Sequence, residues 1–109
     1  MPLRTALLLA ALGQEGALDV VLVLLREEGE WSVGQIQKAV GLPQPTVTRR
    51  LQELATAGLV DHGRRGQPYR LREPGRLSTL LADASRLSEQ LLTLDREAEQ
   101  TFRSRLPSP

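Results

Sequence analysis

The side chains with the clearest chemistry lie in the stretch PQPTVTRRLQELATAGLV, residues 43–60. A guanidinium can fork onto guanine O6 and N7, a glutamine amide can pair with adenine, and a threonine methyl can contact the thymine methyl. Groups of these three kinds follow one another within seven positions, so we interpret them as candidate contacts to double-stranded DNA: Gln44, Thr46, Thr48, Arg49 and Arg50.

Positive charge is concentrated around this stretch. The whole chain has a formal net charge of +1, but residues 43–76 hold seven arginines against three carboxylates and carry +4. The segments on either side are weakly acidic, with −2 over residues 1–42 and −1 over residues 77–109. Clustered arginine on an otherwise neutral domain indicates a phosphate-bearing partner. The alternative is a solvated face, which is the commoner explanation for charge runs in general.

Few residues could support other chemistry. Cysteine is absent and His62 is the only histidine, so disulfides, thiolate metal sites and cysteine nucleophiles are excluded. The chain has no glycine motif that cradles phosphates and no plausible catalytic triad. The adjacent Glu27 and Glu28 would point to different sides of a helix. We therefore expect no enzyme, no metal site and no cofactor.

Two short helices must position the hydrogen-bonding groups. Ser32 and Gln35 have the spacing of a capping box, which predicts a helix from Val33 that ends at Gly41. A second helix should start near Pro45, because proline fits the first turn, and end at Gly58. Helices this close predict a helix-turn-helix over about 33–58. The residues expected to face its core are Val33, Ile36, Val40, Val47, Leu51 and Leu54.

A basic hairpin is predicted next, over about 59–72. The segments 59–62 and 69–72 have strand character, and GRRG at 63–66 suits the turn between them. A helix-turn-helix followed by such a hairpin is a winged helix. Long cations on the wing can reach the minor groove or the DNA backbone, so four arginines join the candidate DNA contacts: Arg64, Arg65, Arg70 and Arg72.

Helices on both sides of this region predict self-association. Residues 3–12 are apolar nearly all round, and residues 17–28 carry a core-facing stripe. Residues 75–102 place apolar side chains at alternating spacings of three and four, which is an a/d stripe held for three heptads. A small domain cannot cover so much apolar surface, so we expect a homodimer. The predicted interface residues are Leu3, Leu7, Leu77, Leu80, Ala84, Leu87, Leu91, Leu94 and Ala98.

The predicted fold is mainly α with a small β-hairpin, a winged helix-turn-helix with flanking N- and C-terminal dimerisation helices. The 109 residues suffice for one domain, expected over 1–102, with a disordered tail at 103–109. No apolar run approaches the roughly 20 residues that span a bilayer, so we expect a soluble, cytoplasmic protein without a membrane partner.

The motifs GLPQPTVTRRLQELATAGLV and GRRGQPYRL resemble the ArsR-type winged-helix transcriptional regulators, and more loosely the MarR type. The resemblance covers roughly residues 17–76. It implies a homodimer that binds an operator and represses transcription until an effector releases it. Two departures stand out. Pro43 replaces the Ser or Thr that usually caps the recognition helix, and the cysteines of the metal-sensing members are missing. The effector could be a small apolar molecule, another protein, or none.

A competing hypothesis is a winged helix that serves as a protein-interaction module without specific DNA binding. Single residues also have plain structural explanations. Trp31 is expected to pack beside the first short helix, and His62 to lie on the wing near phosphate. The acidic residues of the last helix are expected to form its wet face: Asp83, Glu89, Asp95, Glu97 and Glu99.

Overall fold

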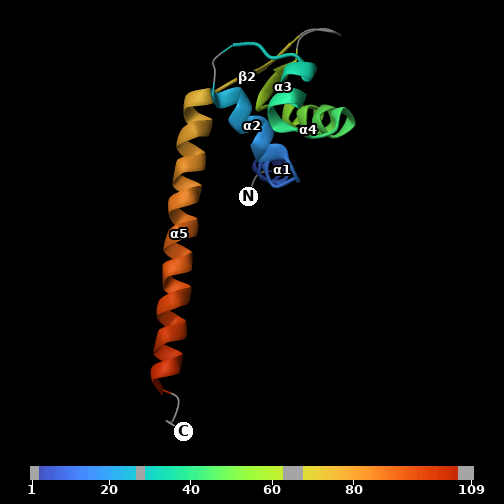
Figure 1. Cartoon of the computed structure of the whole chain (residues 1–109). Coiled ribbons are helices and arrows are strands. Elements are labelled where there is room, and N and C mark those ends of the chain that lie inside the picture. The colour runs from blue at the N-terminus through green and yellow to red at the C-terminus, as the bar shows by residue number, and fades with distance from the viewer. Residues whose placement is uncertain (1–2, 27–28, 63–67, 106–109) are drawn as a thin grey trace. The chain divides into compact units, whose positions relative to one another are not determined.

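The computed structural model describes residues 3–26, 29–62 and 68–105, with the side chain of His62 left out. Within these residues, five helices and two short strands follow one another (Figure 1). The predicted fold class, mainly α with a small β-hairpin, is confirmed. In chain order the elements are α1 (Leu3–Leu12), α2 (Ala17–Arg26), α3 (Val33–Val40), α4 (Gln44–Thr56), β1 (Val60–His62), β2 (Tyr69–Leu71) and α5 (Pro74–Arg105).

The chain divides into two compact units by its internal contacts, residues 1–74 and residues 75–109. The first unit holds α1 to α4 and the hairpin, and the second holds nearly all of α5. That the two units act as one domain over 1–102 remains a prediction.

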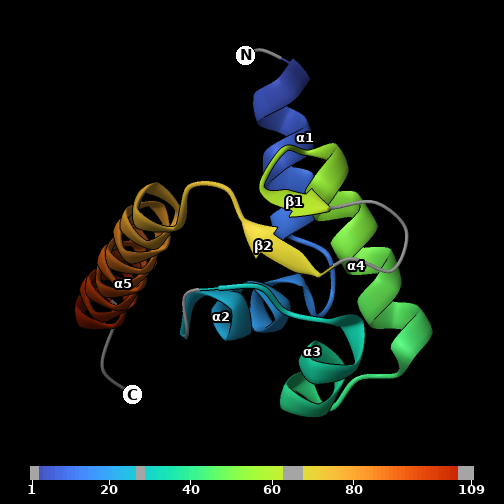
Figure 2. The same ribbon diagram turned by 90° about the horizontal axis from the view of Figure 1, so that it is seen from above.

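Helix α4 contacts four other elements of the first unit, α1, α2, α3 and β1 (Figure 2). Its predicted inward residues Val47, Leu51 and Leu54 are fully buried. Ile36 of α3 and the pair Val20 and Val21 of α2 complete the set of large side chains that are fully buried. Because each such side chain contributes about 1.5–3 kcal/mol when it leaves water, this core fixes which side of α4 remains exposed.

The predicted boundaries of α3 are confirmed by specific hydrogen bonds. The Gln35 N–H donates to Ser32 Oγ over 3.1 Å, and the Ser32 N–H donates to Gln35 Oε1 over 2.9 Å, which completes the capping box. Gly41 ends α3 with a left-handed φ of 73°. Such a φ is strained for any residue with a Cβ.

Helix α4 begins at Gln44, one residue before the predicted start. Pro43 makes no side-chain cap, as expected, and only its carbonyl helps by accepting the Val47 N–H over 3.1 Å. The turn between α3 and α4 is therefore held by main-chain geometry and by the packing of Val47 rather than by a hydroxyl.

The wing strands are antiparallel, with Val60 opposite Leu71 and Asp61 opposite Arg70. They are shorter by one residue each than the predicted 59–62 and 69–72. Trp31 exchanges two main-chain hydrogen bonds with Tyr69, at 2.8 and 2.7 Å, and so extends the pairing beyond the hairpin. Burial leaves Tyr69 only 5% exposed, and this desolvation raises the pKa of its hydroxyl.

Helix α5 is a continuous helix of 32 residues that ends at Arg105. Residues 103–105, predicted as the start of a disordered tail, are helical, and an intrahelical pair of Arg103 and Glu99 at 2.7 Å lies in this last part of the helix. The rest of that predicted tail, 106–109, lies outside the described residues. Leu77 is the only buried side chain that the described part of α5 contains.

No single helix among the described residues is both long and apolar enough to cross a membrane. Helices α1 and α2 reach that length and hydropathy only when added together, and they are bent by 87°.

Candidate nucleic-acid interface

The exposed side of α4 forms a shallow recess of polar and cationic groups. We call this recess the outer face of α4. Arg49 lies there without an ion pair among the described residues, so its guanidinium is available to an external acceptor. The outer face is lined by Gln44, Pro45, Thr48, Arg49 and Gln52.

Sequence reasoning missed Gln52 and Pro45 on this face. The signal was present in the spacing: Gln44, Thr48 and Gln52 recur every four residues and therefore form one row along the helix. Pro45 and Arg49 form the neighbouring row. Residue type alone favours the first two turns of the helix and so leaves Gln52 out.

Arg50 does not lie on the outer face. Its side chain is only 12% exposed, and its Nη1 donates to both carboxylate oxygens of Glu53, at 2.7 and 2.9 Å. Arg50, a candidate DNA contact by its residue type, is turned toward the edge of the core because it is three residues from Val47 and four from Leu54 and so flanks the core stripe. Thr46 and Thr48 are half-buried. Their side chains are short, so their hydroxyls stay close to the helix.

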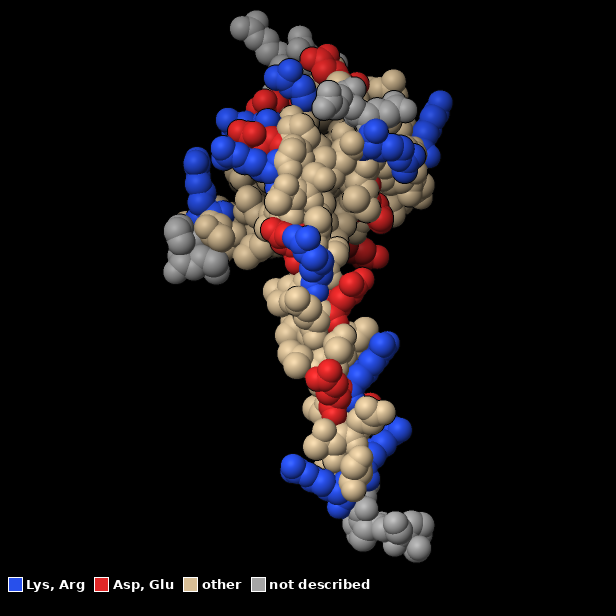
Figure 3. All heavy atoms as spheres, turned by 90° about the vertical axis from the view of Figure 1, so that its left-hand side faces the viewer, with Lys and Arg blue, Asp and Glu red and all other residues tan. Residues whose placement is uncertain are grey.

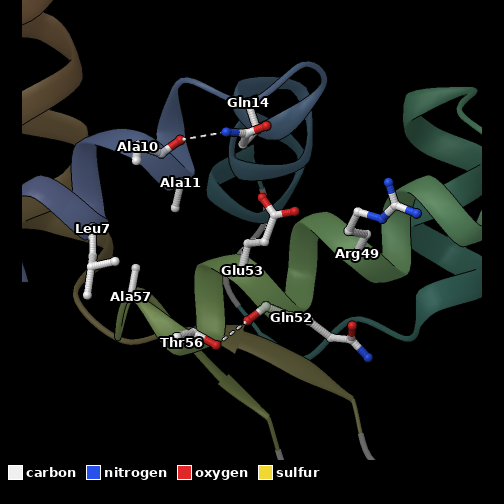
Figure 4. A pocket seen from close by; sticks show the side chains of 9 residues that line it. All are labelled: Leu7, Ala10, Ala11, Gln14, Arg49, Gln52, Glu53, Thr56 and Ala57. Atoms are coloured by element: carbon white, nitrogen blue, oxygen red, sulfur yellow. Dashed lines mark hydrogen bonds between the residues drawn. The ribbon is translucent and has the colours of Figure 1, made fainter.

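A second hollow, of about 300 Å³, lies between α1 and α4 (Figure 4). Leu7 of α1 and Ala57 at the end of α4 give it an apolar side, while Glu53 and Arg49 extend from the same side of α4. Arg49 and Gln52 border both this hollow and the outer face. The complete lining is Leu7, Ala10, Ala11, Gln14, Arg49, Gln52, Glu53, Thr56 and Ala57.

The predicted wing arginines fall into two groups. Arg64 and Arg65 lie outside the described residues. Arg70 and Arg72 are both exposed and share one carboxylate, since Asp61 lies 3.9 Å from Arg70 Nη2 and 3.4 Å from Arg72 Nε. All three side chains are more than half exposed, so water screens these pairs and leaves the arginines free to exchange partners.

The predicted interface residues are exposed with one exception. Leu3 is 76% exposed, Leu87 55% and Leu94 59%, and Ala84 and Ala98 are exposed as well. The exception is Leu77, which is buried. Along α5, acidic and basic side chains are interspersed with uncharged ones (Figure 3).

Metal ligands do not gather in this part of the chain. Over the described ranges, no group of three or more His, Asp or Glu side chains is close enough to hold a metal ion. The sequence contains no cysteine.

Comparisons with known proteins identify the same region. The model of the IclR helix-turn-helix domain matches residues 15–63. The structure resembles the transcriptional repressor BigR from Xylella fastidiosa, with 31% identity over 78% of this chain and 86% of that chain and a TM-score of 0.58. No curated protein matches the sequence.

Two further solved structures agree in fold. One is a homodimeric winged helix-turn-helix DNA-binding domain from Mycobacterium bovis, a possible ArsR-family transcriptional regulator. It is 29% identical over 82% of each chain, with a TM-score of 0.63. The other is an ArsR-like transcriptional regulator from Rhodococcus sp. RHA1, 20% identical over 96% of this chain and 95% of that chain, with a TM-score of 0.56. At that identity the second likeness concerns the fold alone.

Proposed function

The chain belongs to the ArsR-type winged helix-turn-helix transcriptional regulators, which bind DNA, and on this premise we propose that it acts as a homodimeric repressor. Two copies place their α4 helices in the major groove of an operator, at inverted half-sites about 34 Å or a multiple apart. The M. bovis neighbour supports the dimer, and BigR supports repression. Such a regulator works in the cytoplasm and catalyses no reaction.

The division of α4 into two faces carries this proposal. Val47, Leu51 and Leu54 are fully buried, while the opposite side exposes Arg49 beside a row of amide and hydroxyl groups. Because its buried residues hold α4 in place, the helix can enter the major groove of DNA without changing its orientation in the protein. We assign base contacts to Arg49, Gln44, Thr48 and Gln52, and place Thr46 at their edge.

The wing is assigned to phosphate contacts. Arg70 and Arg72 support this because their shared partner Asp61 is half-exposed and can be exchanged for a phosphate oxygen. Arg64 and Arg65 are assigned to the wing tip from the sequence alone. Replacing Arg64 and Arg65 with Ala should weaken binding to every duplex and reduce the salt slope by about 0.9 for each phosphate that the wing tip no longer neutralises.

The dimer is assigned to the exposed apolar residues of α1 and α5. Leucines that are 40% to 59% exposed along three heptads would be stabilised by a second copy of the same stripe. The proposed interface consists of Leu3, Leu7, Leu80, Ala84, Leu87, Leu91, Leu94 and Ala98.

Selection of bound duplexes from a random library, with the full chain as bait, tests the proposed function. The expected result is an inverted repeat whose affinity falls steeply with salt, with a slope near −0.9 per phosphate contacted. Two controls are a scrambled duplex and a variant with Ala at 44, 48, 49 and 52. An absence of duplex affinity at low salt would favour the protein-interaction module instead.

A further inference from the structure

Arg49 and Arg50 are adjacent in sequence but differ in what they contact. Arg50 is 12% exposed and engages both oxygens of Glu53, whereas no ion pair of Arg49 is found over the described residues. A nearly buried guanidinium is costly unless a carboxylate compensates it. Arg50 is therefore committed to Glu53 within the protein.

Glu53 lies within reach of both arginines. It is three residues from Arg50 and four from Arg49, and both spacings bring side chains together on a helix. Glu53 and Arg49 border the same hollow between α1 and α4, and they extend from the same side of α4 (Figure 4). A Glu53 carboxylate without Arg50 would therefore have Arg49 as its nearest alternative on the helix.

We propose that Arg50 is a positioning residue that holds Glu53 away from Arg49 and so keeps Arg49 free to read DNA. This inference rests on the proposed function, in which Arg49 contacts a base. Arg50 itself contacts Glu53 and not DNA. Its effect on recognition passes through the Glu53 carboxylate, which would otherwise neutralise Arg49 and draw it toward the hollow.

A double-mutant cycle separates this role from a direct DNA contact. The four proteins are the wild type, Arg50→Met, Glu53→Gln and the double variant, each measured on the selected duplex and on a scrambled duplex. Arg50→Met should lower the ratio of the two affinities about tenfold or more, because Glu53 then captures Arg49. Adding Glu53→Gln should restore the ratio to within about twofold of wild type, since the competing charge is gone.

The salt dependence supplies a second readout. Because Arg50 neutralises no phosphate in this proposal, the double variant should keep the wild-type salt slope. If Arg50 contacted a phosphate, the slope would fall by about 0.9 in both backgrounds. If Arg50 read a base, the double variant would discriminate as poorly as Arg50→Met. Either result would overturn the proposal.

Folding is checked by circular dichroism on all four proteins. Should Arg50→Met not fold, the double variant decides alone, because it buries no unpaired charge. Its ratio of affinities for the selected and the scrambled duplex then either equals that of the wild type, as expected, or is lowered by the loss of Arg50, which refutes the positioning role. Should even the wild type bind no duplex, the proposed function fails. The pairing of Arg50 with Glu53 is still tested by a double-mutant cycle of unfolding free energies. Strictly additive changes in these free energies would contradict the pairing.

Discussion

Helices α4 and α5 share a pattern of apolar residues at helical spacing, but they differ in burial. The apolar face of α4 is packed against other elements of the chain, whereas most of that of α5 is exposed. Val47, Leu51 and Leu54 of α4 are fully buried, whereas Leu87 and Leu94 of α5 remain more than half exposed. Neighbouring elements surround α4 on its apolar side. The comparison teaches that spacing defines which face of a helix is apolar, while the packing of other elements decides whether that face is a core or an interface.

Loss of the dimer should be the largest effect. Leu87→Lys with Leu91→Lys would force two ammonium groups into the proposed interface, where an unpaired charge is costly. We expect monomers in analytical ultracentrifugation and a loss of operator binding.

The matched control for this pair is Ser85→Lys with Thr93→Lys, at exposed positions of α5 off the leucine stripe. It adds the same charge to the same helix and should leave the dimer intact. Dimers that persist in the leucine variant would show that α5 is not the interface.

The core of α4 should be the next most sensitive site. Leu51→Ala removes a fully buried side chain and should lower the free energy of unfolding by about 2–5 kcal/mol. Leu92→Ala, at a position 49% exposed, is the matched control and should cost less than about 1 kcal/mol. Urea denaturation at one fixed protein concentration measures both. Equal losses would contradict the contrast between the two helices.

Recognition by Arg49 should follow in magnitude. Arg49→Ala should reduce discrimination between the selected and a scrambled duplex by about 1–3 kcal/mol if Arg49 pairs with a base. Arg96→Ala, on the exposed surface of α5, is the control and should leave both affinities unchanged. Fluorescence anisotropy on both duplexes checks the result. An equal loss of affinity for the selected and the scrambled duplex would indicate that Arg49 contacts a phosphate.

The smallest effect is expected at the wing. Asp61→Asn should release Arg70 and Arg72 and strengthen binding to every duplex by about 0.2–1 kcal/mol, because exposed ion pairs are weak. Asp95→Asn on α5 provides the control for a general change of charge. Unchanged affinity for Asp61→Asn, measured at low salt, would mean that the carboxylate does not restrain these arginines.

Local signals allowed much of the fold to be predicted. The Ser32–Gln35 capping box and the missing cap at Pro43 were predictable, because both depend on groups within one turn of the chain. The inward residues of α4 followed from helical periodicity. The extent of α5 was less predictable, since three terminal residues thought disordered are helical.

The candidate site was predicted only in part. Residue types pointed to the first turns of α4, but they grouped Arg50 with Arg49 and left out Gln52. The spacing of Arg50 from Val47 and Leu54 places it at the edge of the core stripe, but how deeply its side chain is buried depends on the packing of the core against that edge of the helix.

The sequence by itself determined the helix periodicities, the caps and the concentration of arginine in the middle of the chain, since each is a matter of neighbours within a few residues. Only the tertiary structure decided which arginine is buried against a carboxylate and which remains free. That choice depends on how α1, α2 and α3 close around α4, and therefore on contacts between residues far apart in the chain.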